Sequence, residues 1–316
     1  MVSAVIFVAT SCVSPLTGFA FWETNLAYEG ESIYNYLQVK NLSDRTILPA
    51  NVLFGVQSVT MKDKGLTGMY YDTALAAPAL ADNANSALIL GMGTGTYARQ
   101  LKQYYPKMNI TGVEIDQKIT DLAGEYFDEP ADIPVTTYDG RAWLAASHDK
   151  YDVIMVDAYQ DITIPFQMSS TEFFTMVREH LNPGGVMVVN MNMISDGQGS
   201  INEALSDTIA SVFGNGNTLT ADVPNTTNRE LFAKKPGSGS EENSMQQASK
   251  ALNLRETTYE RTGSEDLEWY MEEVASRFRK VNEPDSASTI LTDDKAPVEV
   301  LGMHAIDQII ADEAGP

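Results

Sequence analysis

The chain has 316 residues, and its 43 aspartate and glutamate residues outnumber 21 lysine and arginine residues, which leaves a formal net charge of −22. This length allows one large domain or two ordinary ones with a sizeable core, and a hydrophobic content of 43% excludes a disordered chain. The acidic balance excludes DNA and RNA as partners, because phosphate binding needs a basic surface, whereas a cationic small molecule remains compatible with it. The single cysteine, Cys12, excludes an internal disulfide, and the three histidines show no metal-ligand spacing.

The first element is an uncharged run over residues 2–22, directly before Glu23. About 20 apolar residues span a bilayer, so this run is long enough to cross one. Pro15 and Gly18 interrupt it, and the basic start of a signal peptide is missing. Three interpretations stay open: a membrane anchor, a removed signal and a buried terminal segment. The expected location is membrane-associated through residues 2–22 or cytoplasmic, with the side of the membrane left open.

Residues 33–60 are rich in tyrosine, valine, isoleucine, leucine and threonine with polar breaks, which predicts a few short antiparallel strands. From 86 to 191, short β-type runs alternate with helical segments, as in a parallel α/β sheet. Strands are predicted at 87–90, 110–114, 133–138, 153–157 and 186–190, and helices at 97–105, 117–127, 140–146 and 171–181.

The remaining chain is predicted to complete the sheet over 192–235, to form a solvent loop over 236–244 and an amphipathic helix over 264–280. The predicted organisation has three parts: an apolar segment over 1–24, a small β-region over 25–80, and a Rossmann-like nucleoside-binding catalytic domain over 81–316.

The strongest local motif is a glycine-rich turn between the predicted strand 87–90 and the next helix, with the residues Gly91, Gly93, Thr94 and Gly95. Glycines let the backbone approach a ligand closely. Glu114 ends the following strand, where a carboxylate can accept hydrogen bonds from both ribose hydroxyls of a nucleoside. The spacing differs from Gly-x-Gly-x-x-Gly and looks more like the loop that holds S-adenosylmethionine. The predicted fold is therefore α/β, with a Rossmann-like methyltransferase-type parallel sheet and a small N-terminal antiparallel β-region.

Further carboxylates follow the third and fourth predicted strands. Asp139 and Gly140 follow the third, where an acid can accept from an adenine amine or cap the next helix. Asp157 ends the fourth, and because ligands lie beyond the carboxyl ends of parallel strands, we expect it at the reacting centre. Tyr159 and Asp161 follow in the same loop. Two carboxylates beside a tyrosine suit a protonated amine, which they can bind and deprotonate; the alternative is a capping aspartate in a surface loop.

At these residues the chain resembles the spermidine/spermine synthase (aminopropyltransferase) family, and most of all the branch joined to membrane segments. The stretches 88–95, 113–116, 138–140, 153–165 continuing to Asn190, 169–185 and 291–299 carry the resemblance, together with Tyr34 and the region from Gln57 to Tyr71 and Asp72. The resemblance covers roughly residues 28–300.

The resemblance implies an enzyme, a transferase that moves an aminopropyl group from decarboxylated S-adenosylmethionine to an amine such as putrescine. It implies that Glu114 holds the ribose, that Asp139 reads adenine and that Asp157 is the base. It places Gln57, Tyr71 and Asp72 on the substrate side, and it implies a homodimer without a metal.

Two departures keep other functions open. Polyamine-forming members usually have an acid in the glycine loop where this chain has Thr94, which removes a charge-assisted contact of about 1.5–3 kcal/mol. The second acid of the family's Asp-Ser-Ser-Asp-Pro motif is displaced to Asp161. The first alternative is a small-molecule methyltransferase that uses intact S-adenosylmethionine, which Thr94 favours. The second is a non-catalytic, membrane-tethered domain that binds nucleoside or polyamine, which the apolar start favours.

Overall fold

The computed structural model describes residues 23–51, 56–128, 130–159, 164–192, 199–237, 253–286 and 288–314. The apolar run 2–22, the second predicted carboxylate Asp161 and most of the predicted loop 236–244 lie outside these ranges. Within them, no helix combines the length and the apolar composition needed to cross a membrane.

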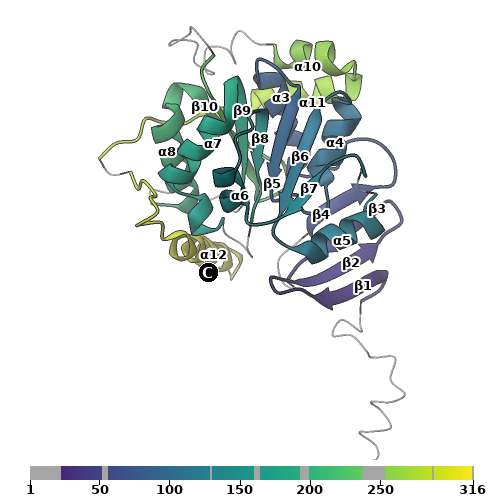
Figure 1. Cartoon of the computed structure of the whole chain (residues 1–316). Helices are drawn as coiled ribbons and strands as arrows, with labels where there is room; N and C mark the ends of the chain where they lie inside the picture. Colours follow the sequence, from purple (N-terminus) through teal and green to yellow (C-terminus); the bar gives the residue numbers. More distant parts are fainter. Residues whose placement is uncertain are drawn as a thin grey trace, which may run out of the picture.

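A large mixed sheet forms the centre of the described structure, with its strands in the order β12-β10-β11-β9-β8-β5-β6-β7 (Figure 1). The strands from β9 to β7 are parallel, and β11, β10 and β12 add an antiparallel edge. The bounds are β5 Ser86–Leu90, β6 Asn109–Glu114, β7 Val135–Thr137, β8 Tyr151–Val156, β9 Leu181–Met191, β10 Thr218–Asp222, β11 Arg229–Lys234 and β12 Phe278–Lys280. The predicted sheet and its completion over 192–235 are confirmed, and the hairpin of β10 and β11 makes it mixed rather than wholly parallel.

Helices cover both faces of this sheet, and each face has its own hydrophobic core. In Figure 1, α7 and α8 lie on one side, and α4, α10 and α11 on the other. The first core includes residues of α2 Tyr70–Ala74, α3 Ala76–Leu80, α4 Thr96–Tyr104, α10 Leu254–Thr262 and α11 Glu265–Ser276. The second includes residues of α6 Gly140–Ala146, η1 Phe166–Met168, α7 Thr171–His180, α8 Ile201–Phe213 and α12 Val298–Ala314. The short helix η2 Asn215–Asn217 precedes β10.

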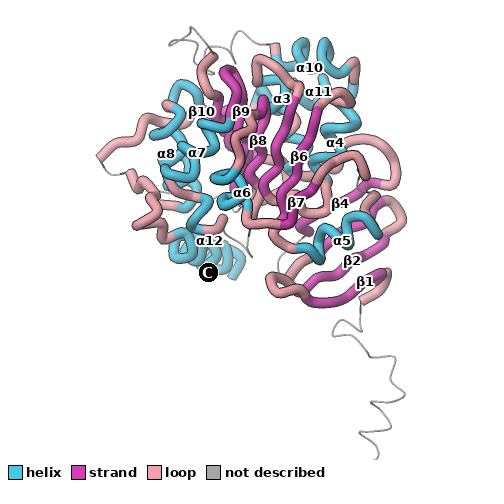
Figure 2. The backbone as a smooth tube through the Cα atoms, in the orientation of Figure 1, coloured by secondary structure: helices cyan, strands magenta, loops and turns pink. Residues whose placement is uncertain are grey.

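A second, antiparallel sheet has the order β1-β2-β3-β4, as the sequence predicts for 33–60. Its strands are β1 Leu26–Glu31, β2 Tyr36–Asn41, β3 Arg45–Pro49 and β4 Val56–Met61. Helix α5, Gln117–Tyr126, lies beside this small sheet (Figure 2). Leu122 and Phe127 pack with Leu37 and Val39 in a third core. The hydroxyl of Thr96 exchanges hydrogen bonds with the main chain of Val59, so the small sheet is fastened to the start of α4.

The prediction of a helix over 264–280 is wrong at its C-terminal end. Helix α11 ends at Ser276, and Phe278 to Lys280 form the edge strand β12, which pairs with β10. The open edge of β10 offers backbone hydrogen bonds that a helix cannot use, and the ring of Phe278 packs against Phe232 with 5.7 Å between centroids. Two short helices, α2 and α3, also lie between the small sheet and β5 in the chain, where the sequence pattern predicts no element.

Candidate active site

A cavity of ≈ 680 Å³ lies at the carboxyl ends of β5, β6, β8 and β9 and is closed on another side by residues of the small sheet. This is the place where an open parallel sheet binds ligands. Its walls include most of the predicted site residues: Gln57, Tyr71, Gly91, Gly93, Glu114, Asp139, Gly140, Asp157 and Tyr159.

The glycine turn after β5 brings three strands together. The main-chain N–H of Gly91 donates to the carbonyl oxygen of Val113 on β6 at 2.9 Å. Gly91 has a φ of +89°, and a Cβ there would lie 2.4 Å from the carbonyl oxygen of Asp157. Only glycine fits this position, because a side chain would meet the backbone that carries the predicted base.

Glu114 ends β6 with a buried carboxylate that the backbone holds in place. Its Oε2 accepts from the N–H of Gly93 at 2.8 Å, and its Oε1 accepts from the N–H of Asp116 at 3.0 Å. Burial raises the pKa of Glu114, while these two hydrogen bonds lower it. The carboxylate therefore has a fixed orientation at the cavity wall and can accept further donors there.

Asp139 caps a helix and also lines the cavity. It is the N-cap of α6, where Oδ1 accepts from the N–H of Ala142 at 2.7 Å, and it lines the cavity beside Gly140. A Cβ on Gly140 would lie 3.5 Å from the methyl of Met168, so the opposite wall is close to this residue.

Asp157 follows β8 and is held by two side chains. The hydroxyl of Tyr70 donates to Oδ2 at 2.7 Å, and Nδ2 of Asn190 donates to Oδ1 at 2.9 Å. Burial raises the pKa of Asp157 from 3.8 to about 7, although both hydrogen bonds lower it. A carboxyl group with this pKa can accept a proton near neutral pH, as a general base must.

Two further predicted residues support the walls near Asp157. The hydroxyl of Tyr159 donates to the carbonyl oxygen of Asn190 and accepts from the N–H of Asn192 at 3.1 Å. The hydroxyl of Tyr71 donates to the carbonyl oxygen of Gln57 at 2.7 Å, which joins α2 to the small sheet. Both tyrosines have a raised pKa because they are buried, so they are neutral hydrogen-bonding groups here.

Three predicted residues do not line the cavity. Asp72 is 1% exposed, and it accepts from Thr67 and from the N–H of Gly68 at 2.7 Å, which closes the turn before α2. Thr94 is fully buried under the small sheet, where its N–H donates to Ser58 Oγ at 3.3 Å. Gly95 is the left-handed N-cap of α4. These residues shape the loops that bring Tyr70 and Gly93 to the cavity.

The structure also shows residues that the sequence analysis missed. Tyr70 and Asn190 contact Asp157 directly, and Nδ2 of Asn228 donates to Oδ1 of Asn190 at 2.8 Å. Asn190 carries the same signal as Asp157, a polar residue near the end of a parallel strand. Beside them in the sheet, Glu230 on β11 pairs with Asn190 and is 0% exposed, and neither of its carboxyl oxygens has a hydrogen-bond partner among the described residues.

Comparison with known proteins identifies a family over much of the chain. The family described as the spermine/spermidine synthase domain matches residues 69–235. A probable polyamine aminopropyl transferase from Bifidobacterium longum is 99% identical over 316 residues, which are 100% of this chain and 71% of that protein. A polyamine aminopropyltransferase from Corynebacterium efficiens is 37% identical over 131 residues, 38% of this chain and 25% of that protein.

Solved structures share the fold. A probable spermidine synthase from Corynebacterium glutamicum aligns with a TM-score of 0.59 at 21% identity and covers 84% of this chain and 99% of its own. A spermidine synthase in complex with the transition state analogue AdoDATO aligns with a TM-score of 0.55 at 20% identity, over 67% of this chain and 74% of its own. The predicted fold class and family resemblance are confirmed: the chain belongs to the spermine/spermidine synthase family.

Proposed function

We propose that this chain is a transferase that moves an aminopropyl group from decarboxylated S-adenosylmethionine to a polyamine acceptor such as putrescine. The observation that carries the proposal is Asp157, whose pKa of about 7 makes it a proton acceptor in the same cavity as the glycine turn and Glu114. The aminopropyltransferase names of the relatives support this reaction over the two alternatives.

The chemistry asks two things of the protein. The acceptor amine must lose a proton to expose its lone pair, and this nitrogen must be aligned with the methylene next to the sulfonium. The carboxylate of Asp157 takes the proton, a carbon–nitrogen bond forms, and the carbon–sulfur bond breaks with its electron pair going to sulfur. Methylthioadenosine leaves as a neutral thioether, so the leaving group needs no proton from the protein.

The other residues divide between two ends of the cavity. At the nucleoside end, Glu114 accepts from the ribose hydroxyls, Asp139 accepts from the adenine amine, and Gly91, Gly93 and Gly140 leave room for the ligand. At the amine end, Gln57, Tyr71 and Tyr159 surround the acceptor. Asp161 lies outside the described residues, and we propose it as the second carboxylate that binds the amine. Asp72, Thr94 and Gly95 act through the shape of their loops.

The decisive experiment follows methylthioadenosine release from decarboxylated S-adenosylmethionine and putrescine, with wild type and the isosteric variant Asp157→Asn. We expect the variant to lose about 10²–10⁴-fold in kcat, the usual contribution of a general base. Asp132→Asn is the matched control, because Asp132 is an exposed carboxylate paired with Lys102 on the surface. If Asp157→Asn keeps the wild-type rate, Asp157 is not the base. If the wild type only transfers a methyl group from intact S-adenosylmethionine, the proposal is overturned.

Homodimer formation and membrane attachment through residues 2–22 belong to the same proposal. Sedimentation of the purified chain over a range of concentrations tests the dimer. Flotation with liposomes, compared between the full chain and a chain that starts at Glu23, tests the attachment; equal recovery of the two chains contradicts it.

A further inference from the structure

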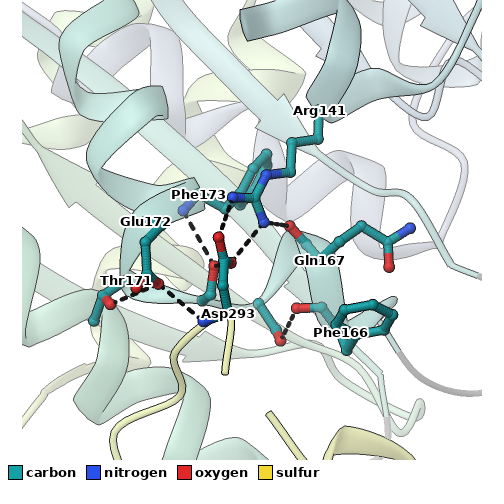
Figure 3. Close-up of polar contacts among 9 residues, drawn as sticks. Arg141, Phe166, Gln167, Thr171, Glu172, Phe173 and Asp293 are labelled. Atoms are coloured by element: carbon teal, nitrogen blue, oxygen red, sulfur yellow. Dashed lines mark hydrogen bonds and ion pairs between the residues drawn. The ribbon is translucent and has the colours of Figure 1, made fainter. Parts of the chain in front are cut away.

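Asp293, which lies beyond the residues that match the family, is connected to the wall of the cavity by one arginine. Arg141 lies in the first turn of α6, directly after Gly140, and its guanidinium holds Asp293 in a two-pronged ion pair. Nη1 lies 2.7 Å from Oδ1 and Nη2 lies 2.6 Å from Oδ2 (Figure 3). The two residues are far apart in the sequence, and only the fold brings them together.

The same guanidinium also holds the backbone of the cavity wall. Nη1 of Arg141 donates to the carbonyl oxygen of Gln167 at 2.7 Å, and Gln167 lines the cavity between Pro165 and Met168. Met168 is 3% exposed, and its methyl is the atom nearest to where a Cβ on Gly140 would lie. Arg141 therefore connects the loop that carries Asp139 and Gly140 with the wall that faces it.

Asp293 is itself held by neighbouring groups, so the pair is more than a mobile surface contact. Ser170 Oγ donates to Oδ1 of Asp293 at 2.5 Å, and the N–H of Asp293 donates to Oε2 of Glu172 at 3.1 Å. The N–H of Thr171 donates to the carbonyl oxygen of the buried Leu291 at 2.9 Å. Figure 3 shows Asp293 beside Arg141 and Glu172 at the start of α7.

The charges agree with this geometry. The guanidinium of Arg141 lowers the pKa of Asp293, and Asp293 raises the pKa of Arg141. A single exposed ion pair contributes little to stability, but a planar, two-pronged contact with a third hydrogen bond fixes orientation as well as distance. Lysine cannot reproduce it, because an ammonium lacks the fork.

We infer that Arg141 and Asp293 are positioning residues that set the width of the nucleoside end of the cavity by holding Gln167 and Met168 opposite Gly140. This inference rests on the proposed function, which gives that end of the cavity to the nucleoside. Gln57, Tyr71 and Asn190 lie outside this network of contacts. Loss of the pair therefore affects nucleoside binding and leaves amine binding nearly unchanged.

The test measures the affinity of the full-length chain for methylthioadenosine by calorimetry, and KM for decarboxylated S-adenosylmethionine and for putrescine, in Arg141→Lys and Asp293→Asn. We expect each variant to weaken methylthioadenosine binding and to raise the nucleoside KM about tenfold, which corresponds to about 1.4 kcal/mol. The putrescine KM stays within about twofold. The double variant loses little more than either single variant, because both act through one contact.

Arg255→Lys is the matched control, since the guanidinium of Arg255 on α10 also uses two of its nitrogens in ion pairs, with Glu268 and Glu272 on α11. Thermal unfolding of each variant establishes that it is folded. If wild type binds methylthioadenosine and both variants bind it equally well, the inference fails and the proposed function stands. If both KM values rise together, the pair supports the whole cavity and not the nucleoside end. If wild type does not bind methylthioadenosine, both proposals fail.

Discussion

The hydroxyl of Tyr70 lies 2.7 Å from Oδ2 of Asp157 and 2.6 Å from the hydroxyl of Tyr71. The hydroxyl of Tyr71 in turn lies 2.7 Å from the carbonyl oxygen of Gln57. Two tyrosine protons cannot fill three hydrogen bonds, because each hydroxyl donates once. All three are filled when Asp157 is protonated and donates to Tyr70. Ionisation of Asp157 therefore breaks one contact in the tyrosine pair, which couples the proton on the base to both rings.

This coupling predicts opposite pH shifts for two matched variants. The pKa of Asp157 is about 7, so kcat/KM in wild type falls as the pH drops below this value, because the base becomes protonated. Tyr70→Phe removes a donor to the carboxylate, which raises the pKa and moves the fall in activity to higher pH. Tyr71→Phe removes the group that competes for the Tyr70 proton, which lowers the pKa and moves the fall to lower pH. The pH profile of kcat/KM measures both, and shifts in the same direction contradict the coupling.

Gly91→Ala is expected to damage both folding and activity. The new Cβ would lie 2.4 Å from the carbonyl oxygen of Asp157, and the φ of +89° is strained for alanine. Strain alone costs about 1–3 kcal/mol in the free energy of unfolding. Gly124→Ala in α5 is the control: a Cβ there meets no atom within 4 Å, and helix propensity favours alanine by about 0.5–1 kcal/mol. Urea unfolding separates the two, and equal stability of both variants would argue against the close approach.

Glu114→Gln is expected to weaken nucleoside binding. Hydrogen bonds to a charged group are worth about 1.5–3 kcal/mol, so losing the charge should raise the dissociation constant of methylthioadenosine about tenfold to a hundredfold. Glu125→Gln, on the exposed face of α5, is the control and should bind like wild type. Unchanged affinity in Glu114→Gln would remove this residue from the ribose site.

Glu230→Gln is expected to change how stability depends on pH. Burial is the main cause that raises the pKa of Glu230, and the nearby charge of Asp157 adds to it. The folded state therefore binds this proton more tightly than the unfolded state does, so the stabilising contribution is complete at low pH and is lost as the pH rises. The variant should gain stability relative to wild type between about pH 5 and about pH 8. Urea midpoints at both values measure this, and a difference that stays constant with pH would contradict it.

Local patterns were sufficient to predict most of the fold. The apolar run before Gly91 and the regular alternation of strands and helices predicted β5, β6 and β8 close to their observed bounds, whereas β9 begins at Leu181, five residues before its predicted start. The prediction for helix α11 was wrong at its C-terminal end for a physical reason. The spacing of Phe278 continues a helical stripe, but Phe278 pairs with the free edge of β10 and forms a strand. Pairing between distant segments leaves no mark in local hydrophobic spacing.

The sequence by itself determined the family, the sheet and the carboxylates at its strand ends, since a residue that ends a parallel strand must lie at the ligand-binding edge. Only the tertiary structure decided which neighbouring side chains face the cavity. Tyr70 and Asp72 are two positions apart on α2, so they point to different sides of the helix: one contacts Asp157 and the other closes a turn. Arg141 precedes β8 in the sequence and Asp293 follows β12, so only the folded chain brings the two residues together.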